Sequence, residues 1–345
     1  MCVNIYSVER IITSIITPLF KEAQTMNTAT ADKRQKYDPS NAAAKAGKHI
    51  TVLDTDLGTD DAYALFVLKK LPLRPDYIVA SYGNVPLDTA CKNAVLLTKY
   101  LGIDVPIVKG LDMPFNENAD NNECTFHGKD GLGNQADKIA QKLSFTQVDV
   151  ESLLSFDDFA AEIANCGSVT YITVGTLTNI SYLLENEDFR RKTNGIYIMG
   201  GGINEFNCPH NTEFNFCKDP EGVKKVLTSG LKIVLFPLDF TNHNFITAEQ
   251  IDELEKIGTY KEYIDILRYN LESNKKFDKI PAAVLHDVFP VMYAAQPEWF
   301  ETEEMRVASN EYGSTFISPS GNTVNICRKI ENNKLFDVIK SVFEG

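Results

Sequence analysis

The chain has 345 residues, of which 43% are hydrophobic and 23% are charged, and its net charge is −13. This is an ordinary globular composition, long enough for a large core in one or two domains. The negative charge argues against nucleic-acid binding and against an anionic membrane partner, but it leaves small neutral ligands open.

Residues 1–48 differ in composition from the rest of the chain. The first twenty, MCVNIYSVERIITSIITPLF, form an apolar helix candidate that carries Glu9, ends near Pro18 and lacks the basic start of a signal peptide. The polar stretch that follows predicts a flexible or loosely docked extension. No apolar run approaches the ~20 residues of a membrane span. We expect a cytoplasmic protein, with an organellar presequence as the open alternative.

From His49 onward, short apolar runs alternate with amphipathic stretches. The predicted strands are residues 49–54, 76–83, 105–110, 168–174, 195–200 and 231–237. The predicted helices among them are residues 60–71, 88–101, 150–166, 178–186 and 219–230. This alternation predicts one α/β domain over residues 49–345, with a mostly parallel, Rossmann-like central sheet flanked by helices.

Three further features complete this prediction. The segment from about Leu111 to Gln147 is long and polar, and the chain after Phe240 is mostly helical in pattern. Residues 314–321 and 322–330 are expected to form a C-terminal hairpin, and residues 333–344 a final helix. The seven scattered cysteines include no CxxC pair and indicate reduced thiols, with no zinc site or disulfide framework.

Four aspartates lie within eight positions of the stretch ITVLDTDLGTDDAYAL: Asp54, Asp56, Asp60 and Asp61. Helix capping explains one or two of them, but adjacent carboxylates raise one another's pKa unless a cation is near. Ca²⁺ takes carboxylate, carbonyl and water oxygens, and no Cys or His lies in the cluster to favour zinc or copper. The cluster therefore predicts a hard divalent cation at the carboxyl end of a strand, where open α/β sheets bind ligands.

An alternative for this stretch is a haloacid-dehalogenase-like phosphatase, in which Asp54 is the nucleophile and Asp56 the acid/base. Leu57 interrupts that signature before Gly58, and the scheme gives the second pair of aspartates no role.

Other polar groups follow later strands. Asn84 follows the second strand, and His286 and Asp287 stand together at a predicted helix start, where a histidine beside a carboxylate is a candidate acid or base. The loop after residue 200 has no nucleotide-binding glycine motif, but it offers amides and a carboxylate for sugar hydroxyls and phenylalanines for stacking on a ring. Those loop residues are Phe206, Asn207, Glu213, Phe214 and Asn215.

Taken in order, these segments resemble the nucleoside hydrolase family of the inosine–uridine-preferring type, from about His49 to near the C-terminus. The most specific element is D-T-D-x-G-x-D-D-A-x-A-[LI] at 54–65. The segments that reinforce it are 83–85, 127–128, 177–179, 199–202, 213–215, 239–241 and 286–287.

The resemblance implies a Ca²⁺-dependent nucleoside N-ribohydrolase. It implies that Asp56 is both a Ca²⁺ ligand and the general base that deprotonates the metal-bound water. Asp61, the Val174 carbonyl and Asp287 would be the other protein ligands, and Asp54 would orient the metal site. His286 would be the general acid that helps the base to leave. The positions that match substrate contacts are Asp60, Asn84, His127, Met199, Asn207, Glu213, Phe214 and Asn215.

The resemblance also implies a nucleoside substrate such as inosine, guanosine or uridine, a role in purine salvage and a homodimer or homotetramer. Two departures affect the base pocket. The family's D-V-T-H is here Asp239–Phe240–Thr241–Asn242, with His243 one residue later, and the single Trp299 is poorly placed for a base sandwich. A non-catalytic Ca²⁺-dependent nucleoside-binding protein is the alternative from another class.

Overall fold

A computed structural model describes residues 45–113, 125–145 and 148–345. Most of the expected N-terminal extension, including its helix candidate, therefore lies outside the described residues. Within them, no helix is both long and apolar enough to cross a membrane. The five cysteines of this part of the chain are free thiols.

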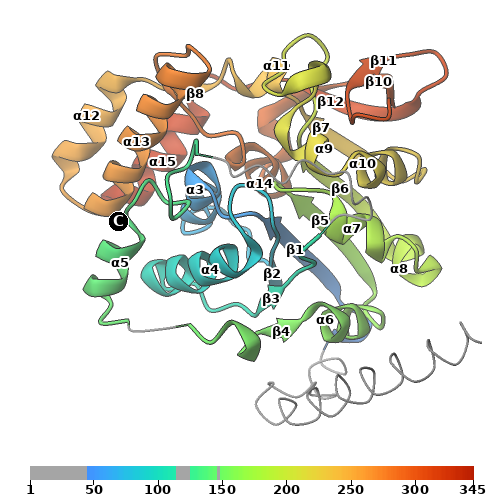
Figure 1. The fold of residues 1–345 in the computed structure, drawn as a ribbon, viewed down its shortest axis with the longest axis horizontal. Coiled ribbons are helices and arrows are strands. Elements are labelled where there is room, and N and C mark those ends of the chain that lie inside the picture. The colour runs from blue at the N-terminus through green and yellow to red at the C-terminus, as the bar shows by residue number, and fades with distance from the viewer. Residues whose placement is uncertain (1–44, 114–124, 146–147) are drawn as a thin grey trace, which may run out of the picture.

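A ten-stranded mixed sheet forms the centre of the molecule, in the order β11-β10-β12-β7-β6-β5-β1-β2-β3-β4 (Figure 1). All neighbouring pairs from β12 to β4 are parallel, whereas β10 is antiparallel to both of its neighbours. The strands are β1 (His49–Thr55), β2 (Tyr77–Ala80), β3 (Ile107–Lys109), β4 (Leu154–Ser155), β5 (Ser168–Thr173), β6 (Thr193–Met199), β7 (Ile233–Phe236), β10 (Phe300–Ser309), β11 (Thr315–Ile317) and β12 (Asn322–Ile330). The predicted mostly parallel α/β sheet is confirmed.

Strand β1 lies at the point where the strand order reverses. The chain runs from β1 outward through β2 and β3 to β4, then returns to pair β5 with the other edge of β1. Ligands of open α/β sheets bind in the crevice at such a switch point, outside the carboxyl ends of the strands. Here that crevice lies beyond Thr55 and Thr173.

Helices cover both faces of the sheet (Figure 1). Alternate residues of β1 serve two cores, because Val52 packs with one buried cluster and Leu53 with the other. The helices are α3 (Thr59–Val67), α4 (Leu87–Leu101), α5 (Ala136–Lys142), α6 (Phe156–Ile163), α7 (Thr178–Leu183), α8 (Glu187–Lys192), α9 (Phe214–Lys218), α10 (Pro220–Leu227), α11 (Leu238–Thr241), α12 (Ala248–Ile257), α13 (Lys261–Phe277), α14 (Val288–Ala295) and α15 (Lys334–Glu344).

The expected C-terminal hairpin is wrong in its pairing. Strands β11 and β12 do not pair with each other; each pairs with β10, which lies between them and was not predicted. Strand β12 then joins this antiparallel edge to the parallel sheet through β7. A short two-stranded sheet of β8 (Phe245–Ile246) and β9 (Ala283–Val284) was also missed.

The predicted helix over 150–166 is too long at its start. Residues Val150–Ser152 form a 3-10 turn and β4 follows, so helix α6 begins at Phe156, where the Ser155 side chain accepts from the Asp158 N–H. Helix α5 falls within the long polar segment, for which no helix was predicted, and α9 falls within the expected loop after residue 200. The final helix α15 agrees with its prediction.

Candidate active site

Asp54, near the carboxyl end of β1, links this strand to neighbouring parts of the fold. Its fully buried carboxylate accepts hydrogen bonds from the Tyr171 hydroxyl at 2.7 Å and the Asn179 amide at 3.3 Å. Burial raises the pKa of Asp54 to about 7, and the Tyr171 hydrogen bond opposes that rise. Asp54 does not line the pocket, so it can support the site only indirectly, by stabilising the end of β1.

Asp56 follows β1 and is tied to the loop after β2. Its carboxylate accepts from the main-chain N–H of Asn84 at 2.7 Å and from the Asn84 side-chain amide at 3.0 Å. A β-carbon on Gly83 would lie 1.9 Å from Asp56 Oδ2, so glycine is what allows this close approach. Burial, followed by the charge of Asp61, raises the pKa of Asp56 well above its usual range.

Asp61 lies in the first turn of α3, where the free N–H groups and helix dipole favour a carboxylate. It accepts from the Gly58 N–H at 2.7 Å, from the Thr55 hydroxyl, and from the Asn84 amide at 3.2 Å. Asn84 thereby links Asp56 to Asp61, so the predicted substrate contact also organises the carboxylates.

Three buried carboxylates could hold a cation. Oxygens of Asp60, Asp61 and Asp287 all lie within 4.8 Å of one another. One oxygen of Asp60 is buried without a hydrogen-bond partner among the described residues. Burial, and then the charge of Asp61, raises the pKa of Asp60 to about 8, and burial likewise raises the pKa of Asp287. A hard divalent cation would remove both the unpaired oxygen and the mutual repulsion, so this donor set fits one.

Among side-chain ligands, this cluster differs from the predicted set in one member, because it contains Asp60 in place of Asp56. It contains Asp61 and Asp287 as expected, but its third carboxylate is Asp60, which was assigned to the ribose. Val174 lines the pocket, and its carbonyl accepts from the Asn215 amide at 2.9 Å.

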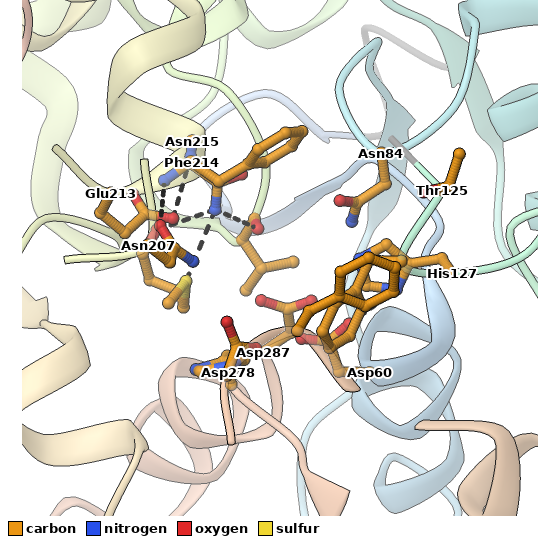
Figure 2. Close-up of a pocket in the computed structure, with 15 residues that line it drawn as sticks. Asp60, Asn84, Thr125, His127, Asn207, Glu213, Phe214, Asn215, Asp278 and Asp287 are labelled. Carbon is orange, nitrogen blue, oxygen red and sulfur yellow. Dashed lines mark hydrogen bonds and ion pairs between the residues drawn. The ribbon is translucent and has the colours of Figure 1, made fainter. Parts of the chain in front are cut away.

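A pocket of about 240 Å³ opens above these carboxylates. Figure 2 shows the floor, formed by Asp60 and Asp287, between two walls. On one wall, Glu213 caps α9 and accepts from the Asn215 and Phe216 N–H groups, while Asn207 accepts from the Phe214 N–H at 2.9 Å. Burial raises the pKa of Glu213 to about 7. The residues of this wall are Met199, Asn207, Glu213, Phe214 and Asn215.

The opposite wall carries His127 beside Asn84 (Figure 2). His127 stacks at a tilt on Phe126, with ring centres 4.9 Å apart, and Phe126 lies 5.8 Å from Phe277. Burial lowers the pKa of His127 to about 3. These two phenylalanines, together with Thr125 and Asp278, line the pocket and were not predicted.

His286 lines the pocket next to Asp287, which is the N-cap of α14. Its Nδ1 lies 2.7 Å from the Thr241 hydroxyl, and burial lowers the pKa of His286 to about 4. Thr241 belongs to the Asp239–Asn242 segment in which the sequence departs from the D-V-T-H of the family that it resembles. His243, in contrast, is largely exposed and pairs with Glu205.

Not every predicted residue lies at the pocket. Phe206 is exposed and is absent from the lining, so only Phe214 of the proposed stacking pair faces the cavity. Asp56 and Asp61 lie behind the lining. The other predicted positions that line the pocket are Asp60, Asn84, His127, Val174, Met199, Asn207, Glu213, Asn215, His286 and Asp287.

Comparison with known proteins gives a consistent result. A family model described as inosine-uridine preferring nucleoside hydrolase matches residues 51–337. The chain is similar to the pyrimidine-specific ribonucleoside hydrolase RihB of Escherichia coli O17:K52:H18, with 29% identity over 75% of this chain and 82% of that protein. This family match includes the aspartate cluster and therefore overturns the alternative of a haloacid-dehalogenase-like phosphatase.

Solved structures share the fold. A plant nucleoside hydrolase superposes with a TM-score of 0.75 at 23% identity, covering 86% of this chain and 99% of that one. A purine-preferring ribonucleoside hydrolase from Gardnerella vaginalis gives 0.73 at 21%, with the same coverage of both chains. The family match spans most of the chain and includes the four aspartates from Asp54 to Asp61 and the His286–Asp287 pair. The chain therefore belongs to the inosine-uridine preferring nucleoside hydrolase family and is an enzyme, a nucleoside N-ribohydrolase.

Proposed function

We propose that the enzyme hydrolyses inosine, guanosine or uridine to ribose and the free base, with Ca²⁺ as its cofactor. The observation that carries this proposal is a cluster of three buried carboxylates at a pocket whose walls differ in chemistry, with Asp60 and Asp287 on the pocket floor and Asp61 behind them. One wall offers amides and a carboxylate suited to sugar hydroxyls, and the other offers aromatic rings suited to a base.

We assign Asp61 and Asp287, with the Val174 carbonyl and Asp56, as the protein groups that hold the cation. Asp60 supplies a further oxygen near it. When bound, Ca²⁺ makes a nucleophilic water available near neutral pH and favours the ionised form of the carboxylates.

Asp56 is the proposed general base. The two Asn84 hydrogen bonds orient its carboxylate, so that it is held in one position to accept a proton from the attacking water. Cleavage of an N-glycosidic bond passes through a positively charged ribosyl species, and the surrounding carboxylates stabilise that charge.

The ribose contacts follow from the polar wall. Asp60 and Asn215 are proposed to bind the 2′- and 3′-hydroxyls, and Asn207 and Glu213 the 5′-hydroxyl. Glu213 is fixed by three main-chain N–H groups, so it can orient a hydroxyl without moving. His286 is proposed to assist the leaving base by donating a hydrogen from its ring.

A panel of inosine, guanosine, adenosine, uridine and cytidine tests this proposal. The enzyme reloaded with Ca²⁺ should release reducing sugar from at least one of inosine, guanosine and uridine. Sugar release from none of the five, with Ca²⁺ shown to be bound, would refute the proposed activity. Tight binding of intact inosine would instead favour the non-catalytic alternative.

The resemblance also supports a proposal of a cytoplasmic homodimer or homotetramer that serves purine salvage. Light scattering coupled to size exclusion measures the assembly, and a monomeric mass at working concentrations would contradict it.

A further inference from the structure

His127 is the end point of a chain of hydrogen bonds that begins on α13. The Asn274 amide donates to the main-chain carbonyl of Asn270 at 2.9 Å and to the Asn270 side-chain oxygen at 2.8 Å. The Asn270 amide then donates to the Thr59 hydroxyl at 3.0 Å. Thr59, Asn270 and Asn274 are all buried.

The direction of this chain is fixed at its start. A main-chain carbonyl can only accept a hydrogen bond, so the group of Asn274 that faces it must be the NH₂. The same NH₂ requires that the Asn270 oxygen faces it, which leaves the Asn270 NH₂ to face Thr59. The Thr59 hydroxyl therefore accepts from Asn270, and its own hydrogen is free to be donated onward.

The direction is fixed independently at its other end. The main-chain N–H of Thr59, which can only donate, points at His127 Nδ1 at 3.0 Å, and the Thr59 hydroxyl lies 2.9 Å from the same nitrogen. If Nδ1 carried a hydrogen, it could accept from neither of these two donors, so Nδ1 must be the nitrogen without a hydrogen. The competing partner is Asp60, but its nearest oxygen lies 3.6 Å from Nδ1, which is too long for a hydrogen bond.

We infer that Thr59, Asn270 and Asn274 are positioning residues that fix His127 as its Nε2–H tautomer. The ring then presents a single hydrogen-bond donor to the pocket, and within the described part of the chain no hydrogen bond occupies Nε2. A β-carbon on Gly58 would lie 2.7 Å from His127 Nδ1, so the backbone packs closely against the ring and restricts its movement.

This inference rests on the proposed function for the identity of its ligand. His127 lies between Asp60, the proposed ribose contact, and the aromatic pair Phe126 and Phe277. An Nε2–H donor at this junction suits an acceptor on the base next to the glycosidic nitrogen, which is O2 of a pyrimidine or N3 of a purine. As the bond breaks, negative charge grows on the base, and a fixed donor stabilises it.

Nitrogen-15 spectra of the histidines in the substrate-free enzyme test the tautomer without any need for activity. We expect His127 to carry its hydrogen on Nε2, with His127→Asn used to assign the signal. A hydrogen on Nδ1, or on both nitrogens at pH 7, would overturn the inference even if the enzyme hydrolyses nucleosides.

Kinetics test the consequence for catalysis. Thr59→Val removes the hydroxyl donor and should lower kcat/KM for inosine about tenfold, the effect of losing one oriented hydrogen bond. For 3-deazainosine, which lacks the N3 acceptor, the same variant should change kcat/KM little. Thr59→Ser should recover most of the loss. Thr98→Val removes a buried threonine hydroxyl on α4, outside the pocket, and controls for general destabilisation.

Equal losses for inosine and 3-deazainosine in Thr59→Val would show a merely structural role for the hydroxyl and refute the proposal. If the wild-type enzyme with Ca²⁺ bound releases sugar from none of the five panel nucleosides, the proposed function fails, while the spectra still decide the tautomer.

Discussion

Removal of the hydrogen bond from Tyr171 to Asp54 tests whether Asp54 stabilises the candidate metal site, because neither residue lines the pocket. Both side chains are fully buried, and the 2.7 Å bond ends on a carboxylate. A hydrogen bond to a charged group contributes about 1.5–3 kcal/mol, and burial places this one in the upper part of that range. Tyr171→Phe should therefore lower the free energy of unfolding at pH 8 by about 2–3 kcal/mol.

The effect should depend on pH with a defined sign. Folding raises the pKa of Asp54 to about 7, so its contribution to stability is fully present below the unfolded pKa, near 4, and is lost as pH rises through 7. Loss of the Tyr171 donor raises that pKa further. At pH 5 the folded Asp54 is protonated with or without the donor, so the cost of Tyr171→Phe should fall to about 1 kcal/mol, as for a neutral hydrogen bond.

Tyr63→Phe is the matched control. The Tyr63 hydroxyl is also buried, but it donates to the main-chain carbonyl of Tyr263 at 2.8 Å. Its removal should cost about 1 kcal/mol at both pH values. Urea denaturation measures both variants, and calorimetric Ca²⁺ titration should show about tenfold weaker binding for Tyr171→Phe alone. Equal, pH-independent costs for the two variants with unchanged Ca²⁺ affinity would refute the supporting role of Asp54.

Three further predictions concern the site itself. Asp56→Asn should lower kcat by about 10²–10⁴-fold in steady-state assays while the fold is retained, and a near-normal kcat would remove Asp56 as the base. Gly83→Ala should abolish turnover, because the new β-carbon would lie 1.9 Å from Asp56 Oδ2. The control is Gly102→Ala, at the end of α4 with open space around it, which should keep wild-type activity. Equal activity of the two variants would contradict the predicted clash. His286→Ala should lower kcat for inosine about 10²-fold but leave p-nitrophenyl riboside turnover unchanged, since that leaving group needs no proton; equal losses on both substrates would argue for a structural role.

The sheet was predictable where apolar runs were unbroken. Strands such as β1 and β7 are buried on both faces and appear in the sequence as short hydrophobic blocks. Strand β10 was missed because only two of its ten residues are buried, and the stretch FETEEMRVAS shows no clear alternation. The pairing of β11 and β12 was consequently assigned to the wrong partner.

The carboxylates of the candidate cation site could be predicted from the sequence because they cluster in short motifs. Asp56, Asp60 and Asp61 are near neighbours in the chain, and Asp287 adjoins the conspicuous His286. The base wall was harder, since Phe277 ends a long helix whose pattern is explained by packing alone. Its closeness to Phe126 is a tertiary contact that no local pattern indicates.

The contact between Thr59 and Asn270 spans 211 positions of the chain. Each residue alone is an ordinary polar member of a helix, and only the fold shows that they act on the same histidine. The glycine at position 58 gave a partial signal, because a glycine within the aspartate cluster indicates a close approach of the backbone to other groups.

The most direct test of the account is a metal-controlled product assay. Enzyme stripped of metal and reloaded with Ca²⁺ should convert inosine, guanosine or uridine to ribose and base in equal amounts, and the stripped enzyme should be inactive. Full activity without metal, or intact nucleosides after long incubation with Ca²⁺ bound, would contradict the proposal of a Ca²⁺-dependent ribohydrolase.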